Sequence, residues 1–115
     1  MTKIAVSSEG PTLDDAVDPR FGRAGGFLIV DTETMETHYL DNGSAQAASR
    51  GAGYQAAELV AGAGAEVVLS GRVGPKAFDA LKTAGIQVGQ ECDRMTVREA
   101  VEKFQKGQIT LSGGR

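Results

Sequence analysis

The 115-residue chain has little of several residue types that define well-known classes of protein. Its single cysteine, Cys92, excludes an internal disulfide, and no Cys-x-x-Cys or Cys/His spacing predicts a zinc site. No apolar run approaches the ~20 residues of a membrane-spanning helix, and the first eight residues lack the apolar stretch of a signal peptide. The formal net charge of −3 argues against a general nucleic-acid-binding surface. We therefore expect a cytoplasmic domain without a membrane or nucleic-acid partner.

Glycine is abundant where proline is scarce. The chain has 16 glycines and only three prolines, and glycine at this frequency is about twice its usual share. This combination indicates tight backbone turns inside a packed domain rather than a disordered linker.

The hydrophobic pattern predicts strands and helices in the order β-β-β-α-β-α-β-α. Strands are expected at residues 3–7, 27–31, 36–41, 66–70 and 86–88. Helices are expected at 54–62, with Tyr54 on the buried face, then at 74–85, opened by Gly74-Pro75, and finally at 96–107, opened by the capping-box pattern from Thr96 to Glu99. With right-handed crossovers, this order predicts an α/β fold, a three-layer α/β/α sandwich with a five-stranded mixed sheet. Residues 1–108 form one domain in this prediction, and residues 109–115 form a flexible C-terminal tail.

Four predicted loops meet at the carboxyl ends of the parallel strands, where ligands of open α/β sheets bind. They span residues 18–26, 42–53, 71–74 and 89–95, and they hold five of the seven arginines: Arg20, Arg23, Arg50, Arg72 and Arg94. The N-termini of the helices lie at the same end and favour anions. Solvated arginines that merely cluster are the alternative interpretation. We predict an anion site built by Arg20, Phe21, Gly22, Arg23, Arg50, Gly51, Gly53, Gly71, Arg72 and Gly74.

The remaining motifs give weaker indications of function. Gly51 to Ala56 matches the dinucleotide pattern GxGxxA, but no strand-to-helix turn precedes it. His38, the only histidine, is expected to be exposed or half-packed on an edge strand. Cys92 precedes the last helix and is either a metal ligand or an incidental thiol. Because no nucleophile has a histidine partner in this pattern, we do not expect an acyl-transfer enzyme.

Two stretches resemble the dinitrogenase iron–molybdenum cofactor biosynthesis family over nearly the whole chain. They are Val-Asp-Pro-Arg-Phe-Gly-Arg-Ala at residues 17–24, and residues 53–88 with Gly-Arg-Val-Gly-Pro ahead of the second helix. The resemblance implies a ribonuclease-H-like fold without nuclease activity and non-catalytic carriage of a molybdenum-containing metal–sulfur cluster. Among small stand-alone members it implies a mixed molybdenum–copper sulfide cluster held without ordinary covalent ligation.

One departure bears on how such a cluster is held. Nitrogenase-associated members often have histidine before Phe-Gly, where this chain has Arg20. A guanidinium donates hydrogen bonds and does not coordinate metals, so we expect an outer-sphere contact from Arg20, with Cys92 as a candidate thiolate contact to copper. Two alternatives stay open: an adaptor that docks on a nucleotide-binding ATPase, and a binder of small phosphate ligands or nucleotides.

Overall fold

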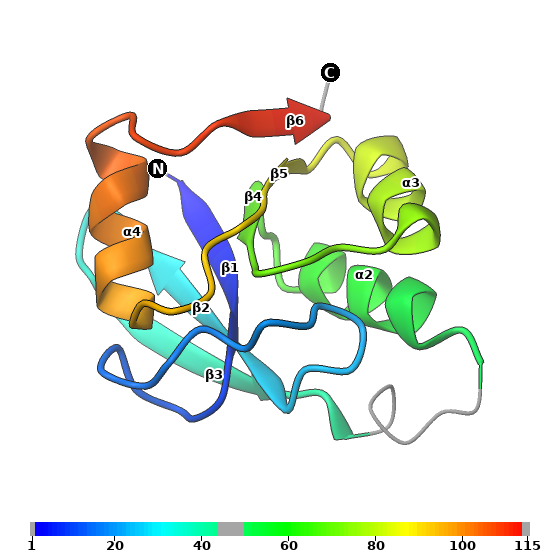
Figure 1. Ribbon diagram of the computed structural model, residues 1–115, viewed down its shortest axis with the longest axis horizontal. Coiled ribbons are helices and arrows are strands. Elements are labelled where there is room, and N and C mark those ends of the chain that lie inside the picture. Colours follow the sequence, from blue (N-terminus) through cyan, green and yellow to red (C-terminus); the bar gives the residue numbers. More distant parts are fainter. Residues whose placement is uncertain (1, 44–49, 114–115) are drawn as a thin grey trace.

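The computed structural model describes residues 2–43 and 50–113. Its core is a six-stranded sheet with the order β3-β2-β1-β4-β5-β6 (Figure 1). β1 pairs in parallel with β4 and β4 with β5, whereas the remaining neighbours are antiparallel. The strands are β1 (Lys3–Ser8), β2 (Gly26–Asp31), β3 (Thr37–Asp41), β4 (Val67–Leu69), β5 (Gln87–Gly89) and β6 (Leu111–Gly113).

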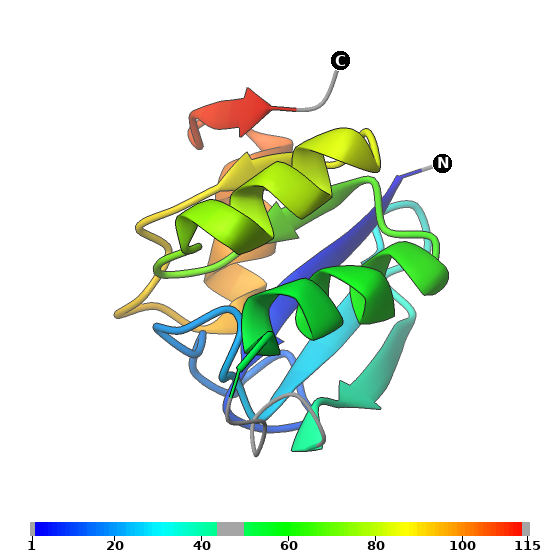
Figure 2. The ribbon, with the colours of Figure 1, turned by 90° about the vertical axis from the view of Figure 1, so that its right-hand side faces the viewer.

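Helices cover both faces of the sheet, as the sequence predicts. α2 (Ala52–Gly62) and α3 (Pro75–Thr83) lie side by side on one face, and α4 (Val97–Gln105) lies on the other (Figure 2). Alternation along β1 divides the core between them. Ala5 packs in the cluster beneath α2 and α3, whereas Ile4 and Val6 pack in the cluster beneath α4. The three-layer α/β/α arrangement is confirmed. No helix of the described ranges is long and apolar enough to cross a membrane.

Two predicted helix starts are confirmed by their local chemistry. Pro75 occupies the first turn of α3, where its missing N–H leaves no hydrogen bond unmade. Thr96 Oγ1 accepts from the Glu99 N–H at 3.1 Å, and the Thr96 N–H donates to Glu99 Oε1 at 3.0 Å, which closes the capping box ahead of α4.

The structure corrects the five-strand prediction. Residues 111–113, which the sequence placed in a flexible tail, form β6 and pair with β5, so the sheet has six strands. The physical reason lies at Gly89. A Cβ there would sit 2.7 Å from Ile109 Cγ2, so the missing side chain lets Ile109 cross the end of β5 and brings Leu111 onto the sheet.

Tyr54 does not lie on the buried face of its helix, contrary to the prediction. Its side chain is 56% exposed, because Tyr54 lies on the side of α2 opposite the residues that pack against the core. The buried stripe of α2 runs through Ala52, Ala56 and Val60, four residues apart, with Ala57 beside it. Residues 44–49 of the predicted loop 42–53 lie outside the described residues.

Candidate anion-binding site

A buried carboxylate shapes the first arginine-bearing loop, residues 18–25, which we call the Asp18 loop. Asp18 is only 3% exposed. Its Oδ1 accepts from the Arg20 N–H at 3.0 Å and from Arg20 Nε at 3.4 Å, and its Oδ2 accepts from the Gly25 N–H at 3.3 Å. An aspartate ahead of proline suits such a turn, because its side chain can bond to the backbone two residues on.

A backbone bridge joins this loop to the second one, residues 70–74, which we call the Arg72 loop. Arg20 and Arg72 form an isolated parallel bridge, in which the Phe21 N–H donates to the Arg72 carbonyl at 3.1 Å and the Arg72 N–H donates to the Pro19 carbonyl at 2.8 Å. Bridge partners lie side by side, so two cationic residues become neighbours. Since like charges at such positions repel, the backbone and not mutual attraction holds them there.

Two hydroxyls fasten both loops to the sheet. Ser7, at the end of β1, donates from Oγ to the Asp18 carbonyl at 2.8 Å, and the Ser7 and Ser70 Oγ atoms lie 2.8 Å apart. Both serines are fully buried. Behind the Arg72 loop, the Val73 N–H donates to Gln90 Oε1 at 2.8 Å. The positions of the arginines are therefore set by several buried contacts.

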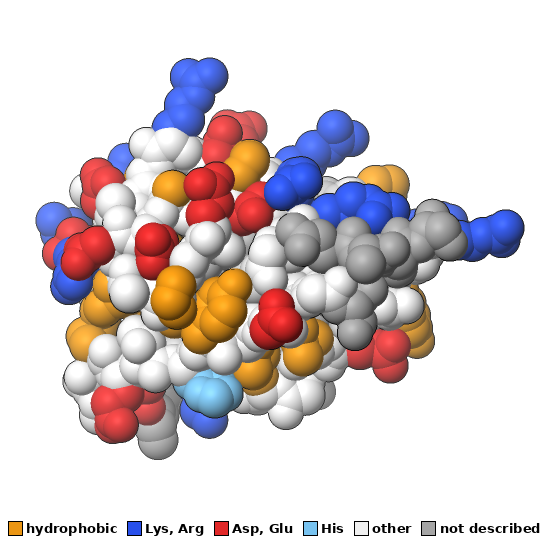
Figure 3. Space-filling model, turned by 90° about the horizontal axis from the view of Figure 1, so that it is seen from below, with side chains coloured by type: hydrophobic (Ala, Val, Ile, Leu, Met, Phe, Trp, Pro, Cys, Tyr) orange, Lys and Arg blue, Asp and Glu red, His pale blue; other side chains and the backbone are white. Residues whose placement is uncertain are grey.

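These loops and the starts of α2 and α3 enclose a pocket of about 630 Å³, the arginine pocket. Four cations line it, and no acidic side chain of the described residues does. Neither helix has a side-chain N-cap, so first-turn N–H groups are left for a ligand. Seen from this end of the molecule, several Lys and Arg side chains lie together toward the upper right of Figure 3, whereas most Asp and Glu side chains lie toward the left, together with other Lys and Arg side chains. The lining residues are Arg20, Phe21, Gly22, Arg23, Ala52, Gly53, Arg72, Gly74, Pro75, Lys76 and Ala77.

The structure brings together seven of the ten residues predicted for the anion site. They are Arg20, Phe21, Gly22, Arg23, Gly53, Arg72 and Gly74. Arg50, Gly51 and Gly71 do not line the pocket among the described residues, and the side chain of Phe21, 1% exposed, packs into the core with its ring centroid 5.0 Å from that of Phe27. Lys76 was missed, although its place directly after Gly74-Pro75 at a helix start was a usable signal.

Two of the glycines are required for close packing of the loops. A Cβ on Gly22 would lie 2.9 Å from the Gly53 backbone, and one on Gly71 would lie 2.5 Å from the Pro19 carbonyl oxygen. Both contacts are backbone atoms that cannot swing aside. The missing side chains therefore let the Asp18 loop approach α2 and the Arg72 loop closely.

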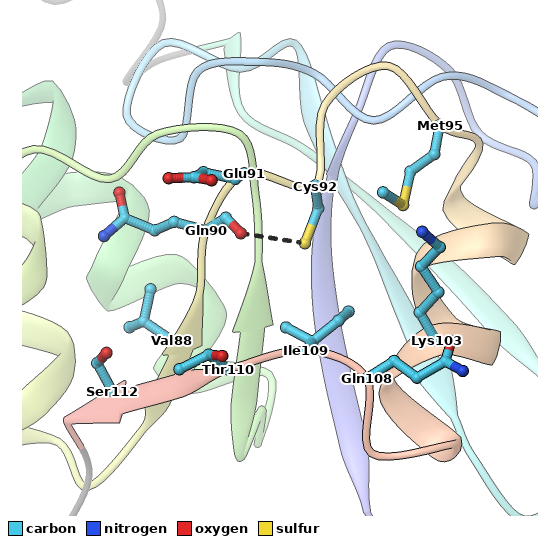
Figure 4. Close-up of a pocket in the computed structure, with 10 residues that line it drawn as sticks. All are labelled: Val88, Gln90, Glu91, Cys92, Met95, Lys103, Gln108, Ile109, Thr110 and Ser112. Atoms are coloured by element: carbon cyan, nitrogen blue, oxygen red, sulfur yellow. Dashed lines mark hydrogen bonds between the residues drawn. The ribbon is translucent and has the colours of Figure 1, made fainter.

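Cys92 lies apart from the arginine pocket. It lines a different pocket of about 450 Å³ with Met95 and Lys103, between β5, α4 and the segment that leads into β6 (Figure 4). The thiol is 2% exposed, and its Sγ donates to the Gln90 carbonyl at 3.7 Å. Burial is the main cause that raises the pKa of Cys92 above its ordinary value. A role for Cys92 as a copper ligand stays a prediction, and no arginine of the described residues lines this second pocket.

We expect this thiol to react slowly in the folded protein. Its folded-state pKa is raised, so the folded state keeps the proton that the unfolded state loses near pH 9.0. The associated stabilisation is present below that pH and is lost as pH rises through the native pKa. At pH 8, an aromatic disulfide reagent should label Cys92 at least about tenfold more slowly in native protein than in urea. Equal rates would contradict the buried, protonated thiol.

His38 and Arg94 also lie outside the arginine pocket. His38 is exposed on β3, as predicted. Arg94 adopts a positive φ of 70° in the turn before α4 and does not line the pocket. Of the five arginines predicted to share one site, three line the pocket: Arg20, Arg23 and Arg72. Lys76 lines it with them.

Residues 2–107 match the family described as dinitrogenase iron-molybdenum cofactor. The chain belongs to this family. The resemblance carried by the loop motifs is thus confirmed, whereas the ribonuclease-H-like label stays a prediction.

Relatives extend over nearly the full length of this family member. The apo form of the orange protein from Desulfovibrio gigas is 55% identical, with a TM-score of 0.96, over 99% of this chain and 95% of that one. A putative NifB protein from Thermotoga is 33% identical, with a TM-score of 0.81, over 95% and 91%. An uncharacterised protein of Methanocaldococcus jannaschii is 29% identical over 112 residues, or 95% of this chain and 90% of the relative.

Proposed function

We propose that the chain binds and carries an anionic molybdenum-containing metal–sulfur cluster of the molybdenum–copper sulfide class, without catalytic turnover of its own. The observation that carries the proposal is the backbone bridge that makes Arg20 and Arg72 neighbours in a pocket with two further cations and no described acid. Membership of the dinitrogenase iron–molybdenum cofactor family and similarity to the orange protein support the choice of cargo.

The donor groups of the pocket fit an outer-sphere mode of binding. Among residues 2–43 and 50–113, no group of three or more His, Cys, Asp or Glu residues could hold a metal ion. Guanidinium and ammonium groups donate hydrogen bonds and do not coordinate metals. The cluster's own sulfides would therefore complete the metal coordination, and Arg20, Arg72 and Lys76 would donate to those sulfides.

The walls of the pocket suit a polarisable, weakly hydrated anion. Ala52, Pro75 and Ala77 contribute apolar surface beside the cations. The volume of about 630 Å³ lies in the range of small-molecule sites. Such a surface favours a sulfide cluster over a strongly hydrated oxyanion of the same charge, because less hydration is lost on binding.

Anaerobic reconstitution tests this function. Apo-protein is mixed with tetrathiomolybdate and copper, desalted, and examined by visible absorption and metal analysis. We expect molybdenum and copper to elute with the protein, together with charge-transfer bands that resist washing. Elution of all thiomolybdate apart from the protein would overturn the proposal.

Competition separates this function from the phosphate alternative. Calorimetry with inorganic phosphate and with nucleotides should show weaker binding than tetrathiomolybdate in the same buffer. Tighter binding of a nucleotide would replace the cluster as the cargo. Docking on a nucleotide-binding ATPase stays a prediction, because no contact of the chain tests it.

A further inference from the structure

A negatively charged side chain lies beside the arginine pocket, although a negative charge there disfavours the binding of anions. Asp18 does not line the pocket, yet its buried carboxylate contacts Arg20, which does. By Coulomb's law, a carboxylate so near the site weakens binding of any anion. Asp18 must therefore contribute to anion binding in another way that outweighs this electrostatic cost.

The contacts of Asp18 show what that contribution is. One oxygen holds both the backbone N–H and the Nε of Arg20, and the other holds the Gly25 N–H at the far end of the loop. Its own backbone is tied to Ser7 through two 2.8 Å hydrogen bonds. The carboxylate is thus a fixed point, and it restrains the Arg20 side chain, which is 60% exposed.

We propose that Asp18 is a positioning residue of the arginine pocket, which fixes the guanidinium of Arg20 for the bound anion by holding its Nε. The contact engages Nε and so leaves the two Nη groups of Arg20 available as donors to an anion. An arginine oriented before binding loses less side-chain entropy on binding, which offsets the adverse charge of Asp18. The inference rests on the proposed anion site and adds a residue outside its lining.

The sign of one substitution tests the idea. Asp18→Asn removes the negative charge, so electrostatics alone predicts tighter binding of tetrathiomolybdate, measured by visible titration. Positioning predicts the opposite, a loss of up to about tenfold, because a neutral amide oxygen holds the charged Nε of Arg20 less strongly than a carboxylate does, and the side chain must then be ordered when the anion binds. Asp14→Asn is the matched control, since it makes the same charge change at an exposed site paired with Arg98. Equal or tighter binding by Asp18→Asn overturns the proposal.

A double-mutant cycle separates positioning from a general effect on the loop. If Asp18 acts through Arg20, Asp18→Asn causes no further loss in an Arg20→Ala background. The same loss in both backgrounds would mean that Asp18 acts through the loop and not through Arg20. That result would also overturn the proposal.

Arg20→Lys keeps the test decisive where Asp18→Asn fails to fold. This variant retains the positive charge but lacks the Nε donor. Because the Arg20 side chain is 60% exposed, we expect the variant to fold. We expect a loss close to that of Asp18→Asn, and wild-type affinity would contradict the proposal. Failure of wild-type protein to bind tetrathiomolybdate overturns the proposed function itself, whereas normal binding by both wild type and Arg20→Lys overturns only the role of Asp18.

Discussion

Replacing Arg20 and Arg72 together by alanine is expected to abolish cluster retention on a desalting column. Hydrogen bonds to charged groups contribute about 1.5–3 kcal/mol each, so two lost guanidiniums correspond to a fall in affinity of about a hundredfold or more. The two side chains are neighbours through the backbone bridge, so both act on one ligand. Molybdenum and copper bound per protein after desalting would measure the effect.

The double variant has a matched control on the opposite face of the sheet. The variant with Arg98→Ala and Lys106→Ala also loses two positive charges, but on the α4 side of the sheet, away from the arginine pocket. We expect this control to keep its cluster. Equal loss in both variants would mean that net charge, and not the pocket, decides retention.

Salt and stability give the arginine pair two further signatures. Raising the ionic strength should weaken binding of tetrathiomolybdate to wild type more than to the double variant, because the variant has fewer charge contacts that salt can screen. Arg72→Ala alone should leave the ligand-free protein at least as stable as wild type, since it relieves the repulsion between two neighbouring like charges and keeps the contact between Arg20 and Asp18. Thermal unfolding without ligand would test this, and a clear loss of stability would contradict it.

Gly71→Ala is expected to destabilise the fold and to weaken the site at once. The new Cβ would lie 2.5 Å from the Pro19 carbonyl oxygen and 2.6 Å from Pro19 Cα. Because these are backbone atoms, the two loops must separate, and the 2.8 Å bond from the Arg72 N–H to the Pro19 carbonyl is lost. We expect a fall of about 2–3 kcal/mol in the free energy of unfolding, typical of overpacking. Urea unfolding measures it.

Gly62→Ala is the control for the loss of glycine flexibility. A Cβ at Gly62, the last residue of α2, meets nothing within 4 Å. Alanine favours helix over glycine by about 1 kcal/mol, so this variant should be as stable as wild type or more stable. Wild-type stability of Gly71→Ala would show that the Arg72 loop can move away from Pro19, and the bridge would then not be rigid.

Much of the fold was set by local patterns that the sequence displays openly. The apolar runs of β1, β2 and β4, the Pro75 start of α3 and the Thr96 capping box depend on nearest neighbours along the chain, and all were predicted. Tyr54 and the sixth strand were not. The start of α2 at Ala52 and the pairing of Leu111 with Gly89 depend on contacts across the fold, which local periodicity does not report.

The sequence by itself determined that arginines follow the carboxyl ends of parallel strands, because chain direction and right-handed crossovers fix which loops share an end of the sheet. Only the tertiary structure decided which of them form one pocket. Backbone hydrogen bonds between residues some fifty positions apart make Arg20 and Arg72 neighbours, and the packing of α3 beside α2 adds Lys76. Cys92 is separated from that pocket because it packs against α4, on the other face of the sheet, and only the folded chain decides which face buries it.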